Sequence, residues 1–448
     1  MSQGAVSLRA YARLLARRRN YRLLWMAQTV SEIGDWFYAV AIYSLLLEIT
    51  GKATPVAIAV VLQVLPQAFV SPLAGALGDR LSRRRVMIFA DLARALIVAL
   101  MFVAQSGQWL WMIYGLLFFE TIMWALFEPA RTATIPNLTE NEHETAVANA
   151  LSSTTWSFNF AVGFFLGGIV AAQFGRSTVL VINVFSFLLS AALLARMRFE
   201  ERHLSNAPPF RVADLVSLAP MAEGLRYVAA DRRRLATMLC KAGIGLLGAN
   251  WVILPILGER VFPLPAEGRD AARAGMFGMS LLLGSRGLGA VLGPLTGAYL
   301  AGSDARRMRL GILFGFLAIG AGYVLLSGAP SIGYACATLV LAHGGASVVW
   351  VFSTTLLHYQ TEDRFRGRVF SADFACLTVT MATVITAAGL AIDRGVPVRD
   401  VVLVTGLLAA LPAGLWAFAG LPLWRSEPPE SGRTLPRATD GPAAPPSV

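Results

Sequence analysis

Charged residues are scarce in this 448-residue chain: Asp, Glu, Lys and Arg make up 15% of it, whereas hydrophobic residues make up 56%. Soluble domains carry about a quarter of charged residues, and the mean hydropathy here is +0.60. A charge content this low argues against an ordinary soluble domain. It indicates a protein that lies largely in lipid.

Cysteine and histidine are also rare, with 3 and 4 residues. The sequence has no Cys/His pattern of the kind that binds metals, no Walker-type glycine loop and no Gly-x-Ser-x-Gly turn for a nucleophile. The three cysteines fall at or within apolar runs, where we expect them to pack as small hydrophobic residues. We therefore predict no metal, no cofactor and no enzyme activity.

Acidic residues are fewer than basic ones, 27 against 38, so the formal net charge is +11. A basic chain can bind nucleic acid or an anionic surface. Here, however, the basic residues stand in short clusters between long apolar runs. This arrangement argues against a nucleic-acid partner and favours the lipid bilayer.

Long apolar runs are abundant. A helix that crosses the hydrocarbon core needs about 20 residues, and about twelve runs of that size occur. Short separators with turn residues divide them. The predicted spans are Leu23–Ile49, Pro55–Leu77, Val86–Gln105, Trp109–Ala130, Ala146–Phe174, Thr178–Arg196, Leu235–Leu257, Gly275–Ala301, Leu310–Ser327, Ile332–His358, Val369–Ile392 and Val401–Leu423.

The distribution of Lys and Arg predicts the orientation, because cytoplasmic segments carry more of both. With the N-terminus in the cytoplasm, the inside segments hold most basic residues, and the C-terminus also lies inside. The inside basic clusters are Arg9–Arg22, Arg80–Arg85, Arg196–Arg234, Arg306–Arg309, Arg364–Arg368 and the tail.

The longest hydrophilic segment divides the spans into two sets of six, and similar basic loops recur in both halves. The sequence predicts an all-α polytopic membrane protein with two pseudo-symmetric six-helix bundles. The predicted parts are an N-terminal amphipathic segment (1–22), the first bundle (23–196), a central cytoplasmic loop (197–234) with an amphipathic helix over Asp214–Arg233, the second bundle (235–424) and a disordered cytoplasmic tail (425–448).

One loop carries a specific motif. Residues 75–84 read GALGDRLSRR, between the second and third predicted spans. This string resembles the G-x-x-x-D-R-x-x-R-R loop of the major facilitator superfamily, and it stands at the same place in the topology. The resemblance implies that Gly75, Asp79, Arg80 and Arg84 form a conformational gate that braces the two halves on the cytoplasmic side.

Further motifs are similar to one branch of that superfamily, which contains the enterobactin exporter and macrolide-efflux proteins. They are SEIGDW at 31–36, ADLARA at 90–95, FEPAR at 127–131, GLRY at 224–227 and RGR at 366–368. One departure occurs: residues 163–168 read GFFLGG, without the proline that exporters often carry there. The resemblance implies a proton-coupled exporter, and the missing proline leaves import by symport open.

Ionisable residues inside a membrane are costly and usually functional. Asp35 lies near mid-depth of the first span, and Glu32 lies on the same helix face three positions earlier. Glu120 lies near mid-depth of the fourth span. A buried carboxyl group can take up a proton on one side and release it on the other. We therefore predict proton-coupling or substrate roles for Asp35, Glu32 and Glu120. A structural hydrogen bond is the alternative for Asp35, and a buried pair is the alternative for Glu120.

Other charges fit a structural network. Asp91 and Arg94 stand three apart and can pair, or Arg94 can instead reach a carboxylate such as Glu128, which can also pair with Arg131. Arg286 is expected to be the only cation within the spans of the second half. It needs a carboxylate partner, for which Asp373 is one candidate, or an anionic group of the substrate.

Polar residues also recur at helical spacing on the fifth span. Asn149, Ser153, Trp156 and Asn159 are predicted to face the cavity, with hydrogen bonds to neighbouring helices as the alternative.

Together these features predict a secondary active transporter that works by alternating access between two rocking halves. The resemblance implies export of a hydrophobic or amphipathic small molecule, drug-like or siderophore-like, in exchange for protons. The alternatives are a lipid or lysolipid transporter and a proton symport importer on the same fold. We expect a monomer in the bacterial inner membrane.

Overall fold

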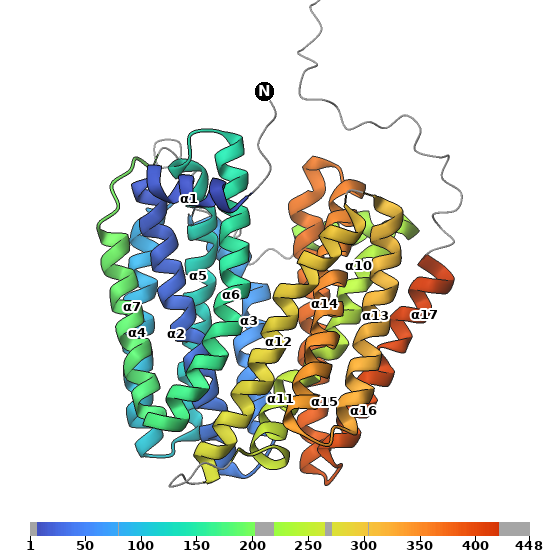
Figure 1. Ribbon diagram of the computed structural model, residues 1–448. Coiled ribbons are helices and arrows are strands. Elements are labelled where there is room, and N and C mark those ends of the chain that lie inside the picture. The colour runs from blue at the N-terminus through green and yellow to red at the C-terminus, as the bar shows by residue number, and fades with distance from the viewer. Residues whose placement is uncertain (1–6, 79, 202–218, 265–270, 303, 421–448) are drawn as a thin grey trace, which may run out of the picture.

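The computed structural model describes residues 7–78, 80–201, 219–264, 271–302 and 304–420. Long helices lie side by side in two bundles (Figure 1). Eleven described helices are long and apolar enough to cross a membrane, and a shorter apolar stretch, Thr54–Val70, supplies a further one. The predicted all-α polytopic fold is therefore confirmed.

The first bundle contains six long helices and a short one across their ends. The short helix α1 meets α2 and α6, and its Leu14 is buried against them. The helices are α1 (Leu8–Arg17), α2 (Arg19–Thr50), α3 (Thr54–Gly78), α4 (Arg83–Ser106), α5 (Leu110–Leu138), α6 (Glu142–Phe174) and α7 (Arg176–Ala195).

The second bundle contains four long continuous helices and two interrupted spans. Proline lacks a backbone donor, and Pro255 precedes a π-turn in which Phe262 N–H donates to the Leu257 carbonyl at 2.8 Å. The elements are α10 (Arg232–Gly245), η2 (Leu246–Ala249), α11 (Asn250–Ile256), η3 (Leu257–Val261), α12 (Ala271–Ala301), α13 (Ala305–Ser327), α14 (Ile332–Gln360), η4 (Asp363–Phe365), α15 (Arg366–Asp393), α16 (Val398–Leu408), α17 (Ala410–Leu415) and η5 (Trp416–Gly420).

Several helices begin at a side chain that accepts a hydrogen bond from the first turn, as N-cap residues do. Asn141 caps α6, Asp304 caps α13 and Ser331 caps α14. The turn after α2 contains Gly51 at φ 62°, a left-handed conformation that glycine adopts without strain. These residues explain where consecutive helices end and begin, although the turns between them are short.

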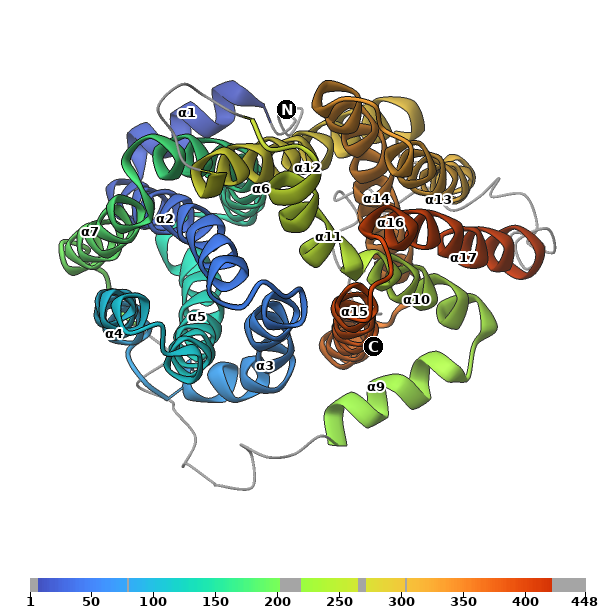
Figure 2. The same ribbon diagram turned by 90° about the horizontal axis from the view of Figure 1, so that it is seen from below.

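The central amphipathic segment differs from its prediction. It was expected to form one helix to Arg233, but α9 (Ala219–Ala229) ends before Asp231, and α10 begins at Arg232. The Asp231 side chain accepts from Arg233 N–H and so starts the new helix. α9 lies along one end of the second bundle against α15 (Figure 2), where Arg368 donates to Glu223 at 2.5 Å. Residues 214–218 and the predicted tail from 425 lie outside the described residues.

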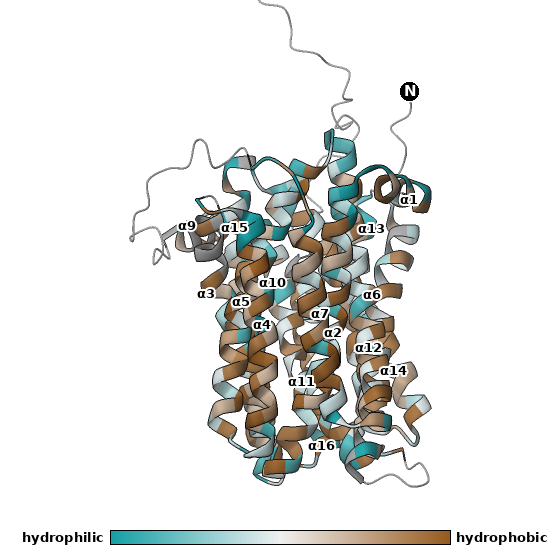
Figure 3. Cartoon of the chain, turned by 90° about the vertical axis from the view of Figure 1, so that its left-hand side faces the viewer, coloured by the Kyte–Doolittle hydropathy of each residue, from teal (hydrophilic) through white to brown (hydrophobic). Residues whose placement is uncertain are grey.

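Hydropathy varies along the molecule as a bilayer requires. Apolar residues dominate the middle of the helices, and polar ones gather at both ends (Figure 3). Large apolar side chains are exposed on the outside, including Phe185 and Phe314 at 64% each. In a soluble protein such exposure would be unfavourable, but here these side chains face lipid.

Candidate functional site

The two bundles meet where α6 lies along α12 and where α3 lies along α15. α6 and α12 approach so closely that the contact needs residues without a side chain. A Cβ on Gly168 would lie 1.9 Å from Ser280 Cβ, and one on Gly287 would lie 2.5 Å from Ala161 Cα. Small residues allow such close packing of membrane helices. The glycines of the fifth span therefore pack tightly even without the family proline.

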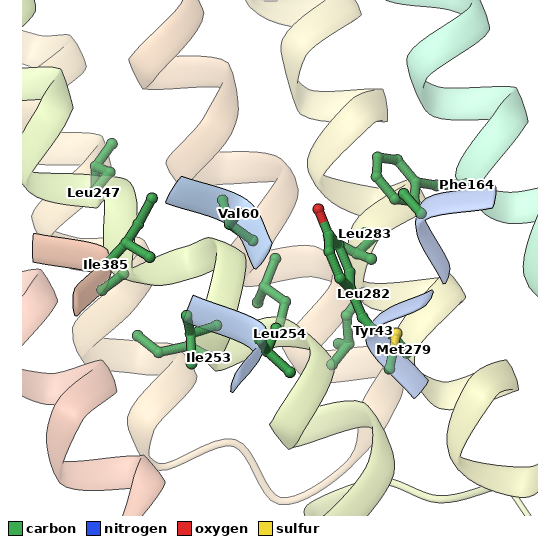
Figure 4. Close-up of a cluster of buried hydrophobic side chains, with 14 of the residues drawn as sticks. Tyr43, Val60, Phe164, Leu247, Ile253, Leu254, Met279, Leu282, Leu283 and Ile385 are labelled. Atoms are coloured by element: carbon green, nitrogen blue, oxygen red, sulfur yellow. The ribbon is translucent and has the colours of Figure 1, made fainter. Parts of the chain in front are cut away.

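The space between the bundles is filled at the end away from the N-terminus. One buried apolar cluster joins both bundles there (Figure 4); among its labelled members are Tyr43, Val60, Phe164, Leu254, Met279 and Leu283. At the rim, the Asp393 carboxylate accepts from the N–H groups of Ala53 (2.7 Å) and Thr54 (2.9 Å). Arg260 donates to the Gly51 carbonyl at 2.8 Å. These contacts hold this end closed.

Toward the N-terminal end, residues next to the interface become exposed. Phe160 of α6 lies at the interface, with its ring centroid 6.2 Å from that of Trp251 on α11. One turn closer to the N-terminal end, Trp156 stacks on Phe160 at 5.7 Å, yet Trp156 is 42% exposed. Exposure therefore increases along α6 from Phe160, which is buried, to Trp156 on the side of the N-terminus.

The predicted polar stripe on α6 divides between two faces. Asn149, Ser153 and Trp156 are exposed and follow one another at i, i+4 and i+7. Asn159 is fully buried, and its amide donates to Glu32 at 2.8 Å. Of the two alternatives for Asn159, the structure shows the hydrogen bond to a neighbouring helix: its position on α6 turns it into the bundle, where it joins α6 to α2.

Asp35, Asp91 and Arg94 form the main charged site of the first bundle. Arg94 is buried and donates to Asp91 at 2.5 Å and to Asp35 at 3.3 Å. Asp91 is also buried, and its second oxygen accepts from Ser190 at 2.6 Å. Phe127 and Phe187 flank the guanidinium at 4.8 and 4.4 Å. The predicted Asp91–Arg94 pair is confirmed, and Arg94 adds Asp35 rather than Glu128.

Asp35 differs from Asp91 in two ways. Its side chain keeps 21% of its surface exposed, and its contact with Arg94 is longer. Glu120 lies within electrostatic range of the same Arg94 and of Asp35, and among the described residues it has no ion-pair partner. Two carboxylates thus contact one guanidinium, and a third lies within electrostatic range of it. The cluster carries an excess of acid that a proton or another cation can balance.

Glu32 has a different environment. It is buried, and its two oxygens accept from Gln28 and Asn159, each at 2.8 Å. Arg131 donates to Gln28 at 3.0 Å. The predicted Glu128–Arg131 pair is confirmed at 2.5 Å. Because both Glu32 oxygens are occupied by amide donors, it joins helices rather than facing a substrate in this conformation.

The predicted gate loop follows α3. Asp79 lies outside the described residues, and Gly75 is part of α3. Arg84 donates to the carbonyls of Leu194 (3.1 Å) and Ala195 (2.5 Å) at the end of α7, where a cation favours the helix dipole. Arg80 bonds through its backbone N–H to the Leu77 carbonyl at 3.0 Å. In this conformation Arg84 holds its own bundle, and bracing of the two halves stays a prediction.

Arg286 stands on α12 at the interface. Its guanidinium carbon lies 3.9 Å from the ring centroid of Trp251 and 4.9 Å from that of Phe160. Its Nη1 is buried and has no hydrogen-bond partner. No carboxylate in the described part of the chain pairs with it, and Asp373, the candidate partner, is bound elsewhere.

Lys241 was missed by sequence reasoning. It lies on α10, donates to Asp373 of α15, and its ammonium stands 4.9 Å from the Trp350 ring centroid. The expectation that Arg286 is the only cation within the spans of the second half is therefore wrong. A lysine inside the apolar run Leu235–Leu257 was the available signal. Its pairing with Asp373 depends on how α10 and α15 are rotated.

A cavity of about 540 Å³ lies elsewhere, between α12, α13 and α14. Its lining is almost wholly apolar and includes Gly293, Gly344 and Phe352, with Arg307 as the charged member. It contains none of the carboxylates described above. We therefore place the candidate site at the bundle interface, where the unpaired Arg286 lies beside Phe160 and Trp251.

Comparison with protein families gives a match over nearly the whole chain. Residues 10–428 match the family model described as transmembrane secretion effector. Macrolide efflux protein A of Streptococcus pyogenes is 26% identical over 391 residues, which is 85% of this chain and 92% of that protein. The MFS-type transporter YfiS of Bacillus subtilis is 28% identical over 220 residues, and the alignment spans half of its length and 48% of this chain.

Solved structures with little sequence identity share the fold. The nucleoside transporter NupG superposes with a TM-score of 0.69 at 9% identity, over 89% of this chain and 98% of that one. A bacterial homologue of the iron transporter ferroportin gives a TM-score of 0.64 at 15% identity, over 89% and 99%. These similarities support the two-bundle transporter fold.

The unequal bonding of the two aspartates generates a stability prediction. Asp91→Asn should lower the free energy of unfolding by about 3 kcal/mol or more, because it breaks a buried pair and leaves Arg94 undercompensated. Asp35→Asn should cost much less, since Asp35 is partly exposed and Arg94 keeps Asp91. Thermal unfolding of both purified variants in one detergent measures this. Equal losses would show that the two carboxylates are equally structural.

Proposed function

Because the chain belongs to the transmembrane secretion effector family of major facilitator transporters, we propose that it is a secondary active exporter of a hydrophobic or amphipathic small molecule, driven by protons. Two relatives described as efflux proteins support export. They are macrolide efflux protein A and the multidrug efflux pump Tap of Mycolicibacterium fortuitum, of which Tap is 27% identical over 224 residues. The aromatic side chains Trp36, Trp156, Phe160 and Trp251 offer an apolar substrate a matching surface.

The observation that carries proton coupling is the excess acid around Arg94. With Asp91 bound by Arg94 and Ser190, Asp35 is the carboxylate that a proton can reach. A proton on Asp35 removes its attraction to Arg94, which still keeps Asp91. α2 and α4 are then joined by one ion pair fewer, so protonation alters a contact between helices. Glu120 is positioned to hold a second proton or to receive the one from Asp35.

Alternating access requires the closed end to open. The Asp393 carboxylate of the second bundle accepts hydrogen bonds at the start of α3, where the helix dipole favours a negative charge. This contact and the apolar cluster of Figure 4 must separate when the bundles rock. The tight α6–α12 contact serves as the axis about which they move.

We place the chain in the bacterial inner membrane with both termini in the cytoplasm. The arginine clusters support this orientation. The cluster Arg9–Arg22 includes most of α1, and the cluster Arg80–Arg85, between α3 and α4, lies at the same end of the first bundle. The open end of the interface would then face the cytoplasm, from which an exporter takes its substrate. We propose that the transporter acts as a monomer, because the interface between its two bundles supplies the whole candidate site.

The proposal predicts that transport depends on Asp35. In proteoliposomes with an imposed pH gradient, a panel of macrolides, lipophilic cations, siderophores and lysolipids should include a compound that moves protons through the wild type. Asp35→Asn should abolish this proton movement, because an amide cannot take up and release the proton. Glu120→Gln should reduce it by about tenfold or more, as removal of a proton-transfer group does. Lumenal pH and substrate flux are recorded together.

Asp400→Asn is the matched control, because Asp400 is exposed at the start of α16 and should leave transport unchanged. The gradient that drives substrate inward or outward distinguishes antiport from symport. If wild type and Asp35→Asn carry substrate at the same rate and neither moves protons, transport is not coupled to protons. That result would favour facilitated or lipid transport.

A second prediction concerns the closed end. Asp393→Ala removes both acceptors and should shift the population toward opening at that end, whereas Asp393→Asn keeps one acceptor and should have a smaller effect. Spin labels at Lys52→Cys and Arg394→Cys, both exposed beside the contact, report the separation by pulsed electron resonance in a chain whose three native cysteines are replaced. A distance distribution identical in all variants would show that Asp393 does not hold this end.

The orientation predicts the activity of reporter fusions. Alkaline phosphatase fused after Gly107, between α4 and α5, should be active because it lies outside, whereas fusion after Glu140, between α5 and α6, should be inactive. Green fluorescent protein after Val448 should fluoresce. The reverse pattern would invert the orientation and turn the open end outward.

A further inference from the structure

Arg286 lies at the centre of the contact between the two bundles. The neighbouring Gly287 touches Ala161 of α6, and the guanidinium is flanked by Trp251 of its own bundle and Phe160 of the other. Any molecule held between the bundles at this depth therefore meets this cation. The side chain is partly buried, and its Nη1 is wholly removed from solvent.

Arg94, Arg131 and Lys241 are paired with carboxylates, whereas Arg286 has no carboxylate partner among the described residues. Arg94 and Arg131 each have a carboxylate at 2.5 Å, and Lys241 is bound to Asp373. Two aromatic rings flank Arg286, and the hydroxyl groups of Tyr43 and Tyr323 lie within electrostatic range of it, but within the described ranges no acceptor meets its Nη1. Cation–π contact compensates part of the charge. A buried donor without an acceptor still costs stability, and such a cost inside a membrane marks a functional group.

The chemistry of the missing acceptor follows from the surroundings. A guanidinium offers parallel N–H groups that match the oxygens of a carboxylate or sulfonate. The two flanking rings belong to an aromatic cluster: Trp36 lies 4.6 Å from Phe160, and Phe164 lies 5.0 Å from Phe160 and 6.3 Å from Trp251, between ring centroids. A molecule that carries an oxyanion on an aromatic or apolar body would match both the guanidinium and the aromatic rings.

We propose that Arg286 binds the negatively charged group of the transported molecule, so that the substrate class is an anionic amphiphile. This inference rests on the proposed function and narrows its substrate. The acid cluster around Arg94 then handles protons, and Arg286 handles the substrate anion. The two roles are divided between the two bundles, and rocking of one bundle against the other links them.

The test compares two probes with one ring system. 1-Anilinonaphthalene-8-sulfonate carries an anion, and N-phenyl-1-naphthylamine has none. Energy transfer from tryptophan to the probe reports binding to the purified full chain in detergent, with protein-free micelles as the background. Wild type should bind the sulfonate at least tenfold more tightly. Arg286→Gln should weaken sulfonate binding by about 10- to 100-fold, the range for a hydrogen bond to a charged group, and leave the neutral probe within twofold.

Two further variants sharpen the result. Arg286→Lys keeps the charge but loses the planar fork, so it should retain part of the preference. Arg232→Gln removes an equal charge from an exposed position at the start of α10 and should change neither affinity. Unchanged affinity for the neutral probe, with a single peak in size-exclusion chromatography, shows that Arg286→Gln is folded.

The outcomes separate this inference from the proposed function. Equal binding of both probes by wild type, or a sulfonate preference that survives in Arg286→Gln, overturns the anion site. Binding needs no pH gradient, so the preference can be lost in Arg286→Gln while wild type shows no proton-driven transport. In that case the anion site stands and proton coupling fails.

Discussion

The constraint on which this structure depends is that a charge inside a bilayer must be paired or must reach water. Arg94, Arg131 and Lys241 satisfy it with carboxylates from the same bundle. Asp35, Glu120 and Arg286 satisfy it incompletely. Of these, Asp35 reaches solvent, and Arg286 lies where the bundles meet. Charges that are fully paired thus stabilise each bundle; of those that are not, Asp35 and Glu120 lie in the first bundle and Arg286 lies at the contact between the two.

The difference between fully paired and partly paired charges also explains how a rigid bundle can contain a carboxylate whose protonation changes. Arg94 is held by Asp91 and by two flanking aromatic rings, and Ser190 in turn donates to Asp91; only the contact of Arg94 with Asp35 is longer. Because the rest of the cluster does not depend on Asp35, a change of its protonation can alter one interhelical contact without unfolding the bundle. Glu32, by contrast, is bound at both oxygens and belongs to the framework.

The contact between bundles combines two kinds of interaction. Glycines bring α6 and α12 within backbone contact, which gives a long and tightly packed axis. At the closed end, two side chains, Asp393 and Arg260, bond backbone groups of the turn between α2 and α3. The contacts at the closed end are therefore few and specific, whereas the glycine contact between α6 and α12 is continuous and tightly packed.

Local features of the site were predictable from the sequence. The length of each apolar run identifies the spans, and the i, i+3 spacing identifies the Asp91–Arg94 and Glu128–Arg131 pairs, because both depend only on the geometry of a single helix. Span ends shifted by a few residues, as with α10, which starts at Arg232 rather than Leu235. The helices extend beyond the apolar runs, because polar residues at their ends continue each helix into the headgroup region of the membrane.

Contacts between distant helices were not predictable in the same way. Arg94 was expected to reach Glu128 if it left Asp91, and Asn159 was expected in the cavity, but helix rotation brings Arg94 to Asp35 and Asn159 to Glu32. Lys241 likewise takes the carboxylate that seemed available to Arg286. The sequence by itself determined which residues carry charge into the membrane and at what depth. Only the tertiary structure decided which of them are paired, because pairing depends on the rotation and packing of helices far apart in the chain.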